Sequence, residues 1–148
     1  MSPEQERGKI PPPFVLAMVI SDSIHTDPGS GKRFILGCFS AIFAHTFPAA
    51  HGMMAVYVAL TNGRGKVPFA LQVVDTGDEQ DEQVLFRGEG EVEFIDPRAV
   101  VELNFFIQNL VFPHPGEYRF QLFAGNEFLM ERRLVVAELP GQPPGEQP

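Results

Sequence analysis

Three histidines lie in segments expected to connect strands, and imidazole is a common zinc ligand. His45 and His51 flank Phe47-Pro48, and His114 lies between two prolines much later in the chain. If these loops met at one end of the domain, the three imidazoles could bind zinc, which takes three or four protein ligands in a tetrahedral array. Their spacing fits no established zinc pattern. We therefore expect these side chains to bond to their own loops or to face solvent.

An acidic segment offers a second kind of metal ligand. It contains five carboxylates close together, namely Asp75, Asp78, Glu79, Asp81 and Glu82. Carboxylate oxygens bind calcium, but the helix-loop-helix calcium pattern needs oxygen ligands at fixed positions with a central glycine and a closing glutamate. This segment does not follow that pattern. We expect a solvated turn that repels other chains from nearby strand edges, and the sequence predicts no resident metal and no cofactor.

No nucleophile with a neighbouring base stands out, so we expect a protein that is not an enzyme. Cys38, the only cysteine, lies in an apolar stretch, which predicts a small buried side chain and excludes an internal disulfide. The serines lack the strained Gly-x-Ser-x-Gly setting of a hydrolase nucleophile. The loop 25–32 partly resembles a phosphate-binding loop, but a strand rather than a helix is expected to follow it.

Composition and charge narrow the choice of partner and compartment. With 148 residues the chain is long enough for one domain, and its 14 glycines and 14 prolines indicate many turns. The formal charge of −8 opposes binding to nucleic acid or to anionic membranes. The apolar run Phe14 to Ile20 is too short to span a bilayer. Together with the lone cysteine, these features lead us to expect a soluble, cytoplasmic protein.

The elements that must position these residues are strands. Tyr118, Phe120, Leu122 and Ala124 alternate with polar residues, and Gly125-Asn126 then supplies the positive-φ pair of a hairpin turn. Asn62-Gly63-Arg64-Gly65 predicts a second hairpin, and Pro68 near the start of its returning strand indicates an edge position. Further strands are expected at 14–23, 33–43, 53–61, 83–95 and 99–110.

About eight such strands predict an all-β protein, an antiparallel β-sandwich of immunoglobulin-like or fibronectin-like type, with a closed barrel as the alternative. The sandwich should occupy residues 14–138 as a single domain. Residues 1–13 should form a flexible, proline-containing tail, and residues 139–148 a disordered tail rich in proline and glycine.

Three stretches resemble a bacterial family, domain of unknown function 6941. They are Phe34-Ile35-Leu36-Gly37 leading to Ile42-Phe43, then Phe47-Pro48-Ala49-Ala50-His51, and finally Leu110-Val111-Phe112-Pro113 to Pro115-Gly116-Glu117-Tyr118. The resemblance covers about residues 14 to 137. It implies a bacterial sandwich domain and supplies no active-site residues.

These observations favour a non-catalytic protein-interaction or structural module, which docks another protein or associates with itself. Strand alternation places Phe39, Phe106 and Phe123 on outward faces, and a cluster of exposed aromatic rings there would mark a contact surface. The alternative is a small-ligand or metal-binding β-sandwich that uses the inter-strand loops around His45, His51 and His114.

Overall fold

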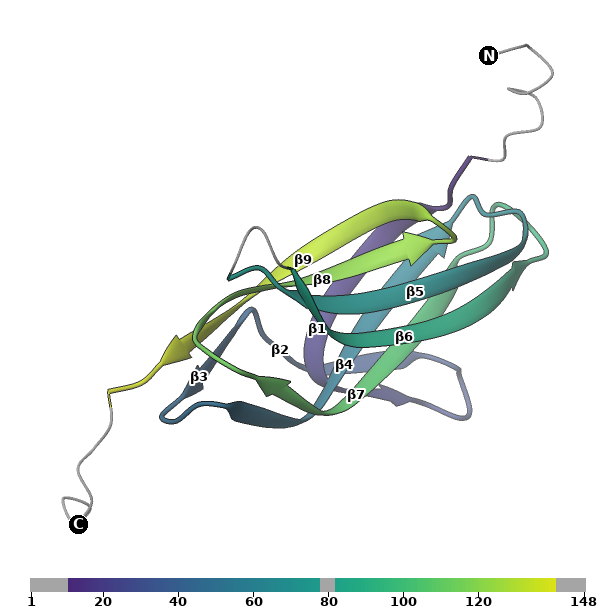
Figure 1. Cartoon of the computed structure of the whole chain (residues 1–148). Helices are drawn as coiled ribbons and strands as arrows, with labels where there is room; N and C mark the ends of the chain where they lie inside the picture. Colours follow the sequence, from purple (N-terminus) through teal and green to yellow (C-terminus); the bar gives the residue numbers. More distant parts are fainter. Residues whose placement is uncertain (1–10, 78–81, 141–148) are drawn as a thin grey trace, which may run out of the picture.

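The structure, a computed structural model, describes residues 11–77 and 82–140 of the chain, and this part is built from strands. The nine strands are β1 (Phe14–Thr26), β2 (Arg33–Cys38), β3 (Ala41–Ala44), β4 (Ala49–Thr61), β5 (Gly65–Asp75), β6 (Gln83–Phe94), β7 (Val101–Phe112), β8 (Gly116–Ala124) and β9 (Glu127–Glu138). They form two sheets packed face to face (Figure 1). The expected all-β sandwich is confirmed. The expected tails fall largely on residues 1–10 and 141–148, outside the described residues.

The first sheet has the strand order β2-β1-β4-β7, and the second has β3-β9-β8-β5-β6. All neighbouring strands are antiparallel except β3 and β9, which run parallel. The single strand expected at 33–43 is in fact two strands in different sheets. The amide of Phe39 still donates to Ile20 of the first sheet, whereas the carbonyl of Ser40 already accepts from Val135 of the second. The chain therefore crosses between the sheets within two residues.

The two predicted hairpins have different outcomes. Strands β8 and β9 do pair across the turn at Gly125, although only the glycine of the Gly125-Asn126 pair has a positive φ. The hairpin predicted at Asn62-Gly63 is wrong, because β4 belongs to the first sheet and β5 to the second. Positive φ values at Asn62 (61°) and Gly65 (66°) turn the chain from one layer into the other instead of back along the same sheet.

Pro68 also departs from its expected edge position, because β5 lies between β8 and β6. The carbonyl of Pro68 accepts from the amide of Gly125, where β8 has just ended in its turn. Backbone N–H and C=O groups of one residue point to the same side in an antiparallel pair. The amide that proline lacks would therefore point beyond the end of β8, where no strand needs it.

The core lies between the sheets and follows the expected alternation of side chains. From β8 it takes Tyr118, Phe120 and Leu122, each with 0% exposure. From β4 and β7 it takes residues such as Val56 and Ile107, also almost fully buried. These inward-facing residues provide the main hydrophobic stabilisation of the two layers.

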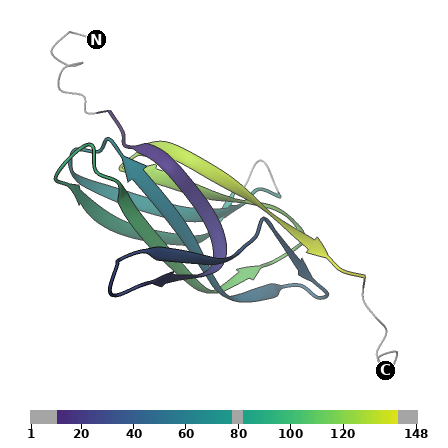
Figure 2. The ribbon, with the colours of Figure 1, turned by 180° about the vertical axis from the view of Figure 1, so that it is seen from behind.

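The β1–β2 hairpin folds across the outer face of the first sheet (Figure 2). Nη1 of Arg33 on β2 donates to Oε1 of Glu102 on β7 at 2.6 Å, although β1 and β4 lie between those strands in the sheet. Ala55 and Ala59 are 0% and 5% exposed, yet they alternate with the core residues of β4 and so point outward. The hairpin therefore covers part of a face that would otherwise be open.

Candidate functional sites

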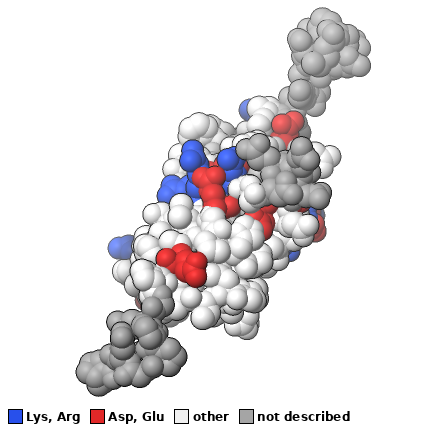
Figure 3. All heavy atoms as spheres, turned by 60° about the vertical axis from the view of Figure 1, so that its left-hand side comes forward, with Lys and Arg blue, Asp and Glu red and all other residues white. Residues whose placement is uncertain are grey.

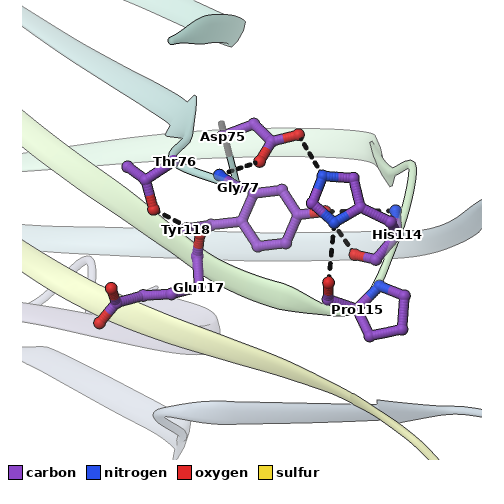
Figure 4. A network of polar contacts seen from close by, with 7 residues as sticks. All are labelled: Asp75, Thr76, Gly77, His114, Pro115, Glu117 and Tyr118. Carbon is purple, nitrogen blue, oxygen red and sulfur yellow. Dashed lines mark hydrogen bonds and ion pairs between the residues drawn. The ribbon is translucent and has the colours of Figure 1, made fainter. Parts of the chain in front are cut away.

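Of the three predicted zinc ligands, His114 has the most ordered surroundings (Figure 4). Its Nε2 lies 2.6 Å from Oδ2 of Asp75, and its Nδ1 lies 2.7 Å from the carbonyl oxygen of Pro115. Asp75 ends β5 and is only 7% exposed, and its other oxygen accepts from the amide of Gly77 at 2.9 Å. The buried carboxylate thus bonds to the end of its own strand and to the loop after β7. Asp75 is therefore not part of the solvated turn expected for the acidic segment. Glu82 is exposed, and Asp78, Glu79 and Asp81 lie outside the described residues.

Both ring nitrogens of His114 face acceptors, so the arrangement is complete only when both carry protons. The hydrogen bond to the carbonyl of Pro115 is the main factor that raises the pKa of His114, and the bond to Asp75 adds to it. There is no room for a side chain at Gly77, since a Cβ there would lie 2.6 Å from the imidazole Cε1. When it is protonated, the ring bonds both to Asp75 at the end of β5 and to Pro115 just before β8.

The bonds of Asp75, Gly77, His114 and Pro115 form a corner of the sandwich, and Tyr118 contacts this corner from the core side. Its hydroxyl donates to the carbonyl of His114 at 2.5 Å and accepts from the amide of the same residue at 3.3 Å. Its ring packs edge-on against Phe112, with centroids 4.9 Å apart, and burial raises the pKa of the Tyr118 hydroxyl. A tyrosine bonded to the backbone four residues upstream resembles the tyrosine corner of immunoglobulin-like sandwiches. This geometry indicates a structural role for the corner.

His51 has a different set of neighbours. Its Nε2 lies 3.7 Å from Oδ1 of Asp22, and its ring lies 5.4 Å from that of Phe39. These residues and Cys38 line an open cavity of about 370 Å³ between the β1–β2 hairpin and β3. Cys38 is exposed rather than buried as expected, because β2 is the edge strand of its sheet. Of the described features, this cavity corresponds most closely to the small-ligand site predicted for the inter-strand loops.

His45 is exposed at the end of β3, so each of the three histidines has its own surroundings. Within residues 11–77 and 82–140, no group of three His, Cys, Asp or Glu side chains could hold a metal ion. The same part of the chain has no helix of a length and apolar character suited to crossing a membrane.

The three phenylalanines chosen as a contact surface do not share one face. Phe106 lies on the outer face of β7 and is 51% exposed. Phe123 lies on the outer face of β8, in the other sheet, and is half-buried against Phe128 at a centroid distance of 5.8 Å. Phe39 is half-buried and packs against the core. Only Phe106 therefore presents most of an aromatic ring to solvent.

Phe106 lies on β7, an edge strand with few of the charged side chains that usually prevent pairing with another chain. Within the described residues, β7 pairs with β4 on one side and with no strand on the other. Pairing with β4 is continuous from Val101 to Gln108, before an irregularity at Asn109, whose φ is 53°. Glu102 is the only charged residue of β7, and it is bonded by Arg33 and by the hydroxyl of Tyr57. Burial and the Glu102 carboxylate raise the pKa of Tyr57 to about 12, so its proton stays in place.

The outer face of the second sheet is polar by comparison. Side-chain bonds run across it from β6 to β9, and they join Arg87 to Gln72, Gln72 to Gln121, and Gln121 to Glu131. Figure 3 shows basic and acidic side chains side by side in one cluster, next to a wide uncharged area. Sequence reasoning missed these cross-strand pairs, because their members are far apart in the chain and the strand order was unknown.

The fold and these sites define an immunoglobulin-like β-sandwich domain. The chain belongs to the family of unknown function DUF6941, whose model matches residues 16–137. No curated protein sequence matches it.

Solved structures resemble the chain at the level of fold. An immunoglobulin-like protein from Pseudomonas aeruginosa is 12% identical, with a TM-score of 0.40, over 88% of this chain and 100% of that one. β-Glucosidase 3B from Thermotoga neapolitana, solved with glycerol, is 12% identical with a TM-score of 0.44, and the match covers 82% of this chain and 16% of the glucosidase. The sensor domain of the anti-sigma factor RsgI4 from Pseudobacteroides cellulosolvens is 14% identical, with a TM-score of 0.38, over 65% of this chain and 91% of that domain.

Proposed function

We propose that this domain is a non-catalytic protein-interaction module that binds another polypeptide along the open edge of β7. The observation that carries the proposal is a twelve-residue edge strand with no charged residue after Glu102. An open edge presents unpaired backbone donors and acceptors, and an added strand satisfies them in the binding mode called β-augmentation. The exposed ring of Phe106 adds apolar contact area beside that edge.

The charge supports a protein partner rather than a nucleic acid or a membrane, since the chain carries a net charge of −8. The single cysteine supports a cytoplasmic setting. The corner at His114 bonds loops together and presents no nucleophile beside a base, which supports a role without catalysis.

Site-specific photo-cross-linking in cells tests the proposal. A photoreactive phenylalanine analogue replaces Phe106 in one protein and Phe128 in the other, since these two residues are almost equally exposed at 51% and 52%. We expect discrete cross-linked adducts from position 106, either with another protein or with a second copy of the chain, and few from position 128. Equal yields at the two positions, or no adduct at position 106, would contradict the proposal.

The cavity beside His51 supports a second candidate, the binding of a small ligand or metal. The imidazole of His51, the carboxylate of Asp22 and the thiol of Cys38 all line it. A ligand selective for the folded state raises the melting temperature. A shift on adding Zn²⁺ that His51→Ala abolishes and His45→Ala retains would favour this candidate, whereas no shift would count against the metal version.

A further inference from the structure

We propose that the partner at β7 is a second copy of this chain, whose own β7 pairs antiparallel with the first about a two-fold axis. The inference rests on the proposed function and names its partner. It would join two four-stranded sheets into one continuous sheet, with β7 next to β7 at the centre.

The charge of β7 allows two identical strands to meet. In a two-fold interface the same surface of both copies comes together, so any net charge there is doubled. Two copies of this chain repel each other overall, because each carries a net charge of −8. The segment from Leu103 to Gln108 carries no charge, and Glu102 just before it is already paired with Arg33 at 2.6 Å. Self-pairing at β7 therefore brings no unpaired carboxylates together.

The neighbouring edge strand, β6, excludes the same arrangement. Glu89, Glu91 and Glu93 alternate along it and lie opposite Ala70, Pro68 and Lys66 of β5, on the outward face. Two β6 strands in register would bring these carboxylates to cross-strand distances of about 5 to 8 Å, where like charges are destabilising. Charges on an edge strand are a common means of preventing such pairing.

The remaining edges carry other obstacles to pairing. The first half of β1 is open, but a β-bulge between Val15 and Ala17 interrupts its ladder and three prolines precede it. The open half of β9 carries the charges Glu127, Glu131, Arg132 and Arg133. Strands β2 and β3 have only 6 and 4 residues. Among the described strands, β7 therefore combines length, lack of charge and regular pairing in a way the others do not.

The side chains beside the edge are placed to contact a second copy. Phe106 is paired with Ala55, and Met53 is paired with Gln108, so Phe106 and Met53 are diagonal neighbours on the outer face. They are 51% and 40% exposed. In a sheet extended through β7, the Phe106 ring would pack against outward side chains of the partner strand, which is the usual source of stability between strands.

The opposite sheet leaves part of this edge accessible. A groove of about 460 Å³ separates the start of β6, at Val84 to Phe86, from residues Ile107 to Val111 of β7. Val84 and Val111 are 54% and 47% exposed beside it. The second sheet therefore does not close over this end of β7, which includes Ile107 and Gln108 of the proposed pairing segment.

Sedimentation of the purified full chain tests the inference. With the wild type, we expect the average mass to rise from the 16.4 kDa of one chain toward twice that value as the concentration increases from about 1 to about 500 µM, a range suited to a modest interface. Phe106→Lys should remain a monomer throughout, because a lysine beside the edge opposes pairing. Phe128→Lys, at an equally exposed ring on β9, should associate as the wild type does.

Gln108→Lys provides a second variant in case Phe106→Lys does not fold, since Gln108 is exposed and lies on the same face of β7. It should weaken association at least tenfold. A wild type that stays monomeric over the whole range would overturn the inference. So would a Phe128→Lys variant that loses association as fully as Phe106→Lys.

The two proposals fail in different ways. If Phe106 cross-links to another protein in cells while the purified chain stays monomeric, the module stands and the second copy is wrong. If Phe106 yields no adduct and the chain is monomeric, both are wrong.

Discussion

Strands β6 and β7 have the same length, 12 residues each, and lie against each other at one side of the sandwich (Figure 1). Each is the last strand of its sheet. Strand β6 has glutamates at 89, 91 and 93, whereas β7 has only the paired Glu102. The two edge strands therefore differ in the number of charged side chains that oppose pairing with another strand. Under the proposal above, the glutamates of β6 oppose pairing, and β7 is the edge that accepts a second strand.

The largest expected effect on stability distinguishes the inward face of β7 from its outward face. Ile107 points inward and is 1% exposed, whereas Phe106 beside it points outward. Ile107→Ala should lower the free energy of unfolding by about 3 kcal/mol, because it leaves a cavity in the core. Phe106→Ala should cost less than about 1 kcal/mol in the monomer. Urea denaturation at low protein concentration measures both, and equal losses would show that Phe106 belongs to the fold rather than to a contact surface.

The next effect concerns the corner that links the segment before β6 to the segment after β7. His114→Gln should lower the free energy of unfolding by about 1 to 2 kcal/mol at mildly acidic pH, because buried Asp75 loses a charged partner. Thermal melts of this variant and of His45→Gln, at an exposed histidine, measure the effect. No loss, or an equal loss in His45→Gln, would contradict the role of this corner.

The loss should depend on pH in a defined direction. Folding raises the pKa of His114 above its ordinary value of 6.5, so the stabilisation is complete below that value and is lost as the pH rises through the folded-state pKa. The difference between wild type and His114→Gln should therefore shrink as the pH rises above 6.5 and through the folded-state pKa of His114. A difference that grows over this range would show that protonation weakens the corner instead.

A smaller effect is expected from a substitution that leaves an unpaired carboxylate on β7, as on β6. Arg33→Ala leaves Glu102 with only the Tyr57 hydroxyl as partner, and it should cost about 1 kcal/mol of stability. The variant should also associate more weakly than the wild type, because an uncompensated carboxylate then lies at the open edge. Arg98→Ala removes an arginine that is 90% exposed and should change neither property. Urea denaturation and sedimentation would show both, and similar behaviour of the two variants would argue against this role.

The smallest effect on stability is expected from substitutions that remove the carboxylates of β6, so that its edge resembles that of β7. Replacing Glu89, Glu91 and Glu93 with glutamine should change the free energy of unfolding by less than about 0.5 kcal/mol, since exposed charges contribute little. It should, however, open a second edge, so that species larger than a dimer appear in light scattering. Glu127→Gln serves as the control. If the triple variant sediments like the wild type, the glutamates do not protect β6.

Much of the fold could be predicted from local pattern. The alternation of Tyr118, Phe120 and Leu122 predicted the inward face of β8, and Gly125 marked its hairpin. Periodicity reports which side of a strand is buried, but it does not report which sheet the strand joins. For this reason the sequence does not reveal the crossings at 39–40 and at 62–64, and the residues of the second crossing resemble a hairpin turn.

The sites were less accessible to prediction, because they join distant residues. Asp75 and His114 are 39 positions apart, so their bond depends on strand order rather than on sequence spacing. Alternation placed Phe106 and Phe123 outward, and both do point outward, but from different sheets. Phe39 lies at the crossing between sheets, where alternation is interrupted, and it packs inward. The edge position of β7 follows from topology alone.

Hydrogen exchange at two protein concentrations tests most directly whether β7, and not β6, binds a second copy. We predict that backbone amides from Leu103 to Gln108 exchange more slowly at high concentration, while those from Gly88 to Glu93 exchange at the same rate at both. Slower exchange in β6, or rates in β7 that do not depend on concentration, would contradict the account.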